Sequence, residues 1–87
     1  MKRQEIPIIV GASDAEARPV YVNDHQGQPH HLGWADPKRI VDSVIELVQS
    51  PNGRALIFGA ESLAPDEHVD LKIIDGGTRG LIAKVQI

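Results

Sequence analysis

Histidine is the residue type whose clustering in this chain could do chemistry. His25, His30 and His31 lie within one stretch, NDHQGQPHHLGWADP, and His68 is far away in the sequence. Imidazole nitrogens bind zinc and nickel, and Asp24 or His68 could complete a four-ligand shell. Neighbouring residues on a strand point to opposite faces, so His30 and His31 would not reach one ion from a strand. For this reason a metal site formed by His30, His31 and His68 is kept only as the alternative to a structural role for these histidines.

Catalysis would need a pair of titratable side chains held together in a cleft. His31 with Asp36, or His68 with Asp66 or Glu67, has suitable residue types, but no sequence pattern holds either pair together. The sequence has no G-x-S-x-G elbow, no phosphate-binding loop and no cysteine, so the common nucleophile signatures are missing. A chain of 87 residues with one expected helix also offers little volume for a deep substrate pocket. We favour a protein without a cofactor and without catalytic activity.

A predicted hairpin positions the histidines. Residues 18–23 (RPVYVN) alternate apolar and polar side chains, as a half-buried strand does. Asp24 and Gly27 suit the first and fourth positions of a type I turn, with Gly27 in a left-handed conformation. The register that aligns apolar residues places Val22 opposite His30 and Val20 opposite Leu32.

The clearest helix follows this hairpin. Asp36 can accept backbone N–H groups at a helix start, and Pro37 suits the first helical position, where no donor is needed. From residue 38 to residue 49 the aliphatic side chains fall on one face at 3.6 residues per turn. Ser-Pro-Asn-Gly at 50–53 predicts the end of this helix, so one amphipathic helix should cover a sheet.

Four further segments are predicted as strands. Residues 5–10 should form an edge strand, or a strand that pairs on a single side, because Pro7 removes one ladder donor. The apolar run 54–60 should form a central strand. Residues 68–74 and 81–87 should form a second hairpin around the glycine-rich turn DGGTRG. That turn and its Arg79 could bind an anion, but no helix follows it, so a simple turn is favoured.

The predicted architecture is one α+β domain over residues 1–87. Its sheet should be mostly antiparallel, with one amphipathic helix packed on it, in the order βββ-α-βββ. Aliphatic residues dominate the apolar composition, whereas Phe, Trp and Tyr occur once each, so the core should consist of aliphatic side chains in a sheet.

Composition also limits the partners. The net charge is −3 and the basic residues are scattered, which makes nucleic acid an unlikely partner. The sequence has no apolar run long enough for a signal peptide or a membrane span. We therefore expect a cytoplasmic protein without a membrane association.

The leading interpretation is a small interaction module, an adaptor, inhibitor or accessory subunit, that binds a protein partner. Tyr21, His25, His31 and Trp34 are the candidate contact residues on the hairpin, although the size and apolar character of Trp34 favour a core position. Val85 and Ile87 lie in an apolar strand that runs to the last residue, and an unprotected strand edge favours a homodimer. The alternative is a small oligomeric enzyme or metal-binding protein whose histidine-rich site lies at a subunit junction.

Overall fold

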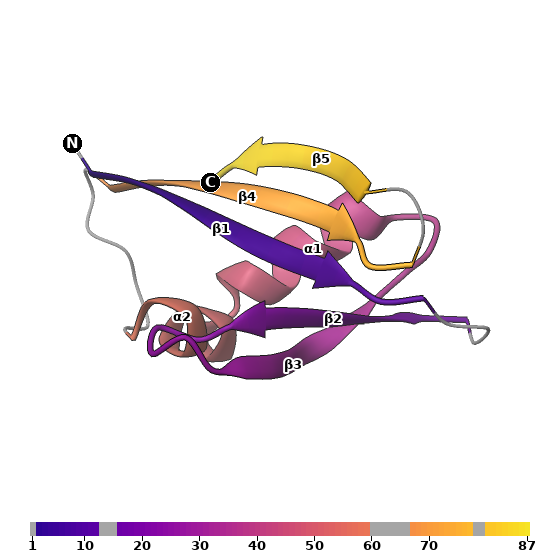
Figure 1. Cartoon of the computed structure of the whole chain (residues 1–87), viewed down its shortest axis with the longest axis horizontal. Coiled ribbons are helices and arrows are strands. Elements are labelled where there is room, and N and C mark those ends of the chain that lie inside the picture. Colours follow the sequence, from indigo (N-terminus) through magenta and orange to yellow (C-terminus); the bar gives the residue numbers. More distant parts are fainter. Residues whose placement is uncertain (1, 13–15, 60–66, 78–79) are drawn as a thin grey trace.

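The computed structural model describes residues 2–12, 16–59, 67–77 and 80–87 of the chain. They form a small α+β domain with a five-stranded mixed sheet and two helices, which confirms the predicted class (Figure 1). The order is βββ-αα-ββ and not the predicted βββ-α-βββ. The elements are β1 (Lys2–Val10), β2 (Arg18–Asn23), β3 (Pro29–Ala35), α1 (Ile40–Gln49), α2 (Pro51–Phe58), β4 (Glu67–Asp75) and β5 (Gly80–Gln86).

The strands lie in the order β3-β2-β1-β4-β5. The β1–β4 pair is parallel and the other three pairs are antiparallel, so the sheet is mixed. β1 is central, so the prediction of an edge strand was wrong, whereas the alternative of pairing on a single side holds for residues 2–7, which pair with β4 alone. Pro7 is tolerated there because β2 pairs only with residues Ile8–Val10 of β1, so the missing N–H of Pro7 falls outside that ladder.

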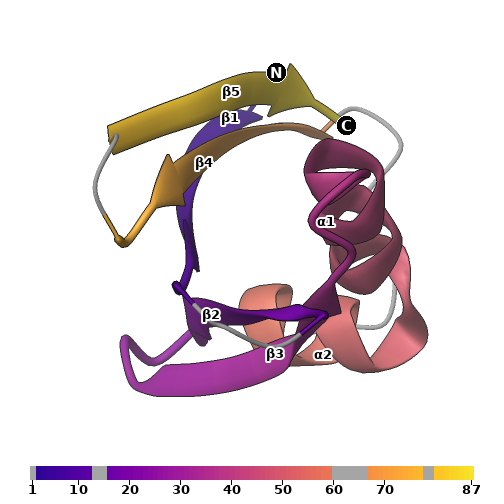
Figure 2. The same ribbon diagram turned by 90° about the vertical axis from the view of Figure 1, so that its right-hand side faces the viewer.

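The sheet is curved, and both helices lie on its concave side (Figure 2). The side chains that fill the space between them are almost entirely aliphatic, which matches the composition. The buried core consists of Ile8, Val10, Val20, Val22, Ala35, Val44, Val48, Ile57, Val69, Leu71 and Ile73. No helix in the described part of the chain is long and apolar enough to span a membrane.

The predicted amphipathic helix is confirmed as α1, which buries Val44 and Val48. It begins at Ile40 and not at Pro37, because Asp36 closes a turn ahead of it. The Asp36 side chain accepts the N–H of Lys38 at 2.9 Å, and its carbonyl accepts the N–H of Arg39 at 2.9 Å.

The central strand predicted at 54–60 is wrong, because residues 51–58 form the helix α2. Ser50 ends α1 and also caps α2: its Oγ accepts the N–H of Gly53 at 3.0 Å, and Pro51 occupies the first helical turn. Gly59 ends α2 in a left-handed conformation with φ 74°. Ser50 and Pro51 therefore begin a second helix, whereas the sequence analysis predicted only that they end the first.

Both predicted hairpins are present. In the β2–β3 hairpin, Asp24 donates its N–H to the Gln28 carbonyl at 2.8 Å, and Gly27 has φ 85°, as predicted. Val22 lies opposite His30, also as predicted. The expected pairing of Val20 with Leu32 is wrong, since a bulge places Val20 opposite Gly33. The second hairpin joins β4 and β5.

Candidate functional site

Three rings lie in contact across the outer side of β2 and β3. The Tyr21 and His31 ring centroids are 5.4 Å apart, and His31 meets Trp34 edge-on at 4.9 Å. Tyr21 is 42% exposed and Trp34 is 57% exposed. Large aromatic side chains held in mutual contact while open to solvent are the residues that most often anchor protein interfaces. We call Tyr21, His31 and Trp34 the aromatic face.

The bulge in β3 puts Trp34 on this face. Tyr21 pairs with His31, and Pro19 pairs with Trp34, so Leu32 is the extra residue between the two pairs. The extra residue shifts the alternation by one, which brings Trp34 to the same side as His31. The favoured core position for Trp34 is therefore wrong. Gly33 was the available signal, because an isolated glycine within a strand pattern often marks a bulge.

Gly11 supports the Tyr21 end of the aromatic face. A β-carbon added to Gly11 would lie 3.2 Å from Cε2 of Tyr21 and 3.0 Å from Cγ of Pro19. Both rings therefore rest against the backbone that follows β1. The Tyr21 ring therefore contacts the Gly11 backbone and the His31 ring, and its remaining surface is open to a ligand.

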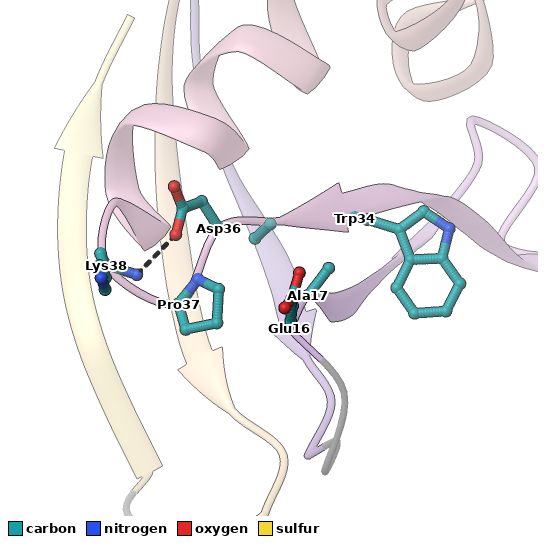
Figure 3. Close-up of a pocket in the computed structure, with 7 residues that line it drawn as sticks. Glu16, Ala17, Trp34, Asp36, Pro37 and Lys38 are labelled. Atoms are coloured by element: carbon teal, nitrogen blue, oxygen red, sulfur yellow. Dashed lines mark hydrogen bonds between the residues drawn. The ribbon is translucent and has the colours of Figure 1, made fainter.

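Two hollows flank the aromatic face. The Tyr21 hollow has a volume of about 360 Å³, and its lining is mostly apolar: Pro7, Ile9, Tyr21, Val22, Asn23 and Pro29. The Trp34 hollow has a volume of about 750 Å³, and three of its lining residues are charged. It is lined by Glu16, Ala17, Trp34, Ala35, Asp36, Pro37 and Lys38 (Figure 3). Glu16 stands between Pro37 and Trp34 in this view, so an indole and a carboxylate border the same space.

His25 lies away from the aromatic face and joins the hairpin to α2. Its N–H donates to the Leu56 carbonyl at 3.1 Å, and its Nδ1 lies 3.3 Å from the same oxygen. A β-carbon on Gly59 would be 3.3 Å from the His25 ring. The contacts of His25 are therefore with α2, the helix beside the hairpin turn. They could not be predicted from the sequence because α2 itself was not predicted.

His30 lies beside the turn and pairs with Asp24. Its Nε2 is 2.8 Å from Asp24 Oδ2. The other carboxylate oxygen of Asp24 accepts the N–H groups of Gln28 at 2.8 Å and Gln26 at 2.9 Å. The Gln28 N–H has the largest effect and lowers the pKa of Asp24. Desolvation has the second-largest effect and opposes it, while the Gln26 N–H and His30 add smaller effects that lower the pKa. This network fixes the turn that presents β3.

The structure does not bring the three candidate metal ligands together. His31 is part of the aromatic face, whereas His30 is opposite Val22 and bound to Asp24. His68 lies on β4, with β2 and β1 between its strand and β3. No group of three or more histidine or acidic side chains in the described ranges could hold a metal ion. Asp66 and Arg79, which were considered for acid–base chemistry and anion binding, lie outside the described residues.

Val85 and Ile87 pack against the core from the last strand. Ile87 exchanges both backbone hydrogen bonds with Val69, at 2.9 and 3.3 Å. Their side chains are partly buried in this subunit, so a partner approaching β5 would meet its backbone edge. Leu81 is the exposed large apolar side chain of this strand, at 51%.

Comparison with known proteins gives no relative. No protein-family model, no curated protein and no solved structure matches this chain.

Proposed function

We propose that this protein is a non-enzymatic interaction module that binds a protein partner through the aromatic face. The observation that carries the proposal is the exposed contact chain of Tyr21, His31 and Trp34. Side chains of this size lose apolar contact with water when a partner covers them, and tyrosine and tryptophan dominate the binding energy of many interfaces. Such a module would serve as an adaptor, an inhibitor or an accessory subunit.

The charges around the aromatic face favour a protein over nucleic acid. Single-stranded nucleic acid also stacks on aromatic side chains, but it needs a groove of lysine and arginine for its phosphates. Among the described residues, none that lines the Tyr21 hollow is basic, and Lys38 lines the Trp34 hollow together with two acidic residues, Glu16 and Asp36. The net charge of −3 acts in the same direction.

A matched set of surface variants tests the proposal. Tyr21→Ala/Trp34→Ala removes the two large exposed rings of the aromatic face, and Leu81→Ala removes a comparably exposed apolar side chain from β5 as the control. Proteins captured by the immobilised wild type are identified, purified and titrated by calorimetry against all three proteins. We expect at least one partner whose affinity falls by tenfold or more, about 1.4 kcal/mol, in the double variant and changes less than about twofold in the control.

Three results would overturn the proposal. The first is that the wild type captures no protein. The second is that each purified candidate binds the double variant as tightly as it binds the wild type. The third is that a single-stranded oligonucleotide binds with saturable quenching of Trp34 fluorescence, which would favour nucleic acid. Circular dichroism of each variant checks that the compared proteins are folded.

We also propose a homodimer formed along β5, supported by the direction of its backbone groups. Because Val69 and Ile87 are a hydrogen-bonded pair, the alternation of an antiparallel ladder turns the N–H groups of Lys84 and Gln86 to the free edge. Lys84→Pro removes one of these donors and leaves the β4 ladder intact. Sedimentation should show a dimer for the wild type and a monomer for the variant. A wild type that is monomeric at high concentration, or a dimer that Lys84→Pro leaves unchanged, would exclude this edge.

The cytoplasm is the proposed location. Small secreted domains commonly depend on disulfides, and this chain has no cysteine. Fractionation of cells that express the tagged protein tests this location, and recovery outside the cytoplasm would contradict it.

A further inference from the structure

We propose that the partner presents an extended segment to the aromatic face, with an arginine side chain in the Trp34 hollow against Glu16 and an apolar side chain four residues away in the Tyr21 hollow. This inference rests on the proposed function, because it describes the chemistry of the partner that the aromatic face binds. It is carried by the different lining of the two hollows and by the register of β2 and β3, which run between them.

The Trp34 hollow fits a cation. Trp34 is 57% exposed and presents an indole, the best ring for a cation–π contact. Glu16 lines the same hollow and forms no hydrogen bond or ion pair with any other part of the chain that the structure describes. Asp36 and Lys38 also line this hollow, and they carry charges of opposite sign (Figure 3). Among the described residues that line this hollow with Trp34, Glu16 is therefore the charged group without an opposite charge to offset it.

Arginine suits this pair of groups better than lysine does. The guanidinium group is planar, so it can stack on the indole of Trp34 while its N–H groups donate to the Glu16 carboxylate. It is also less strongly hydrated than an ammonium group, so less hydration is lost when it enters the hollow. Lysine can make only one of these contacts well, because its charge is compact.

The Tyr21 hollow fits an apolar side chain. Its walls are Pro7, Ile9, Tyr21 and Pro29, with Asn23 at the edge. No charged group lines it in the described residues. Burial of a leucine or a similar side chain there would remove apolar surface of both molecules from water, which favours binding by roughly 25 cal/mol per Å² before the costs of association.

The strand register sets the spacing between the two side chains. Asn23 pairs with Pro29 beside the Tyr21 hollow, and Pro19 pairs with Trp34 beside the other. Residues 19 and 23 are four positions apart on β2, which corresponds to roughly 13 Å at the rise of a strand. An extended peptide covers the same length with four residues, and residues four apart point to the same side. Leucine and arginine separated by three residues therefore match both hollows.

Intrinsic fluorescence reports directly on this site, because Trp34 is the only tryptophan of the chain. The probes are blocked five-residue peptides with serine and glycine in the middle and leucine and arginine at the two ends, made in both chain directions. One control peptide carries glutamate in place of arginine, and another places leucine next to arginine. We expect saturable binding of a spaced leucine–arginine peptide, and binding at least fivefold weaker for both controls.

Two charge-matched variants test Glu16. Glu16→Gln removes the proposed counter-ion, and Glu5→Gln makes the same change of net charge at an exposed position on β1. The peptide should bind Glu16→Gln about five- to tenfold more weakly and should bind Glu5→Gln as it binds the wild type. Equal affinity for the two variants, equal binding of the glutamate peptide, or no saturation with either spaced peptide would overturn the inference.

The two proposals fail in different ways. If a purified protein partner loses affinity for Tyr21→Ala/Trp34→Ala but the spaced peptides do not bind, the aromatic face is an interface and the arginine assignment is wrong. If the peptides bind with the expected dependence on Glu16 and no cellular partner distinguishes the double variant, the peptide site exists without the function proposed for it.

Discussion

Gly33 on β3 faces Leu47 on α1 so closely that a β-carbon on Gly33 would lie 2.6 Å from Leu47 Cδ2. The missing side chain lets the helix approach the strand at this point. The same bulge that turns Gly33 toward the helix turns Trp34 outward, because successive strand residues alternate between faces. The packing of α1 on the concave side and the exposure of Trp34 on the outer side therefore have one local cause.

Gly33→Ala should destabilise the protein by about 1–3 kcal/mol, because the new methyl group meets Leu47. Leu47→Ala removes the obstructing atoms and separately loses apolar contact. In the double variant the cost of Gly33→Ala should fall by at least about 1 kcal/mol, which urea denaturation of the four proteins of the cycle measures. Additive effects of the two substitutions would show that Gly33 does not lie against Leu47.

The junction between α1 and α2 should be more sensitive to an added methyl group than Gly33 is. A β-carbon on Gly53 would clash with the Leu47 carbonyl oxygen, and a backbone atom cannot rotate away as a side chain can. Gly53→Ala should cost at least about 2 kcal/mol. Asn52→Ala, at an exposed position of the same helix, is the control and should change the stability by less than about 0.5 kcal/mol. Equal thermal denaturation of the two variants would contradict the close approach.

Sequence patterns predicted the parts of the fold that depend on local chemistry. The Asp24–Gly27 turn, the pairing of Val22 with His30, the amphipathic α1 and the β4–β5 hairpin each follow from turn residues or from a regular apolar period. These signals act over a few neighbouring residues, so a single sequence contains them.

The errors arose where two local readings fit the same residues. The apolar run after Arg54 fits a central strand or a buried helix, and the Ser50 cap, Pro51 in the first turn and the left-handed Gly59 favour the helix. The position of β1 in the sheet depends on its parallel pairing with the distant β4, which no local pattern specifies. The exposure of Trp34 depends on a single extra residue, Leu32, and hydrophobicity alone favoured the core.

Arg18 should contribute more to stability than the other arginine with side-chain ion pairs. Its Nη2 lies 2.8 Å from Asp75 Oδ1, and the guanidinium also donates to the carbonyls of Val10 and Gly11 at 3.1 and 2.8 Å. The two charged side chains are only 16% and 12% exposed, so water screens the pair weakly. Arg18→Met should cost about 2–3 kcal/mol, since it leaves a largely buried carboxylate and two carbonyls without this donor.

Arg39→Met is the control for Arg18. Arg39 is 58% exposed and lies 3.8 Å from Asp42 and 3.5 Å from Glu46. Exposed pairs at these distances contribute little, so the control should lose no more than about 0.5 kcal/mol. Denaturant unfolding at low and high salt compares the two, and the loss in Arg18→Met should persist in salt. Equal losses in both variants would contradict the structural role given to Arg18.

The pH dependence of stability should report on Asp24. Hydrogen bonds from the Gln28 and Gln26 N–H groups and the contact with His30 hold the pKa of Asp24 below its ordinary value in the folded state. A carboxyl with a lowered folded pKa stabilises the fold fully above its unfolded pKa, and this contribution is lost as the pH falls through the folded value. The stability advantage of the wild type over Asp24→Asn should therefore be constant above about pH 5 and shrink at lower pH.

Asp24→Ala separates the charge of Asp24 from its role in the turn. Asparagine keeps an oxygen that can accept the N–H groups of Gln26 and Gln28, whereas alanine removes the acceptor at every pH. Thermal melts across the acid range should therefore rank the wild type above Asp24→Asn and Asp24→Asn above Asp24→Ala at neutral pH. At low pH the wild type and Asp24→Asn should converge, and Asp24→Ala should stay below both. A wild-type advantage that grows on acidification would have the opposite sign to a lowered pKa and would exclude this account of the turn.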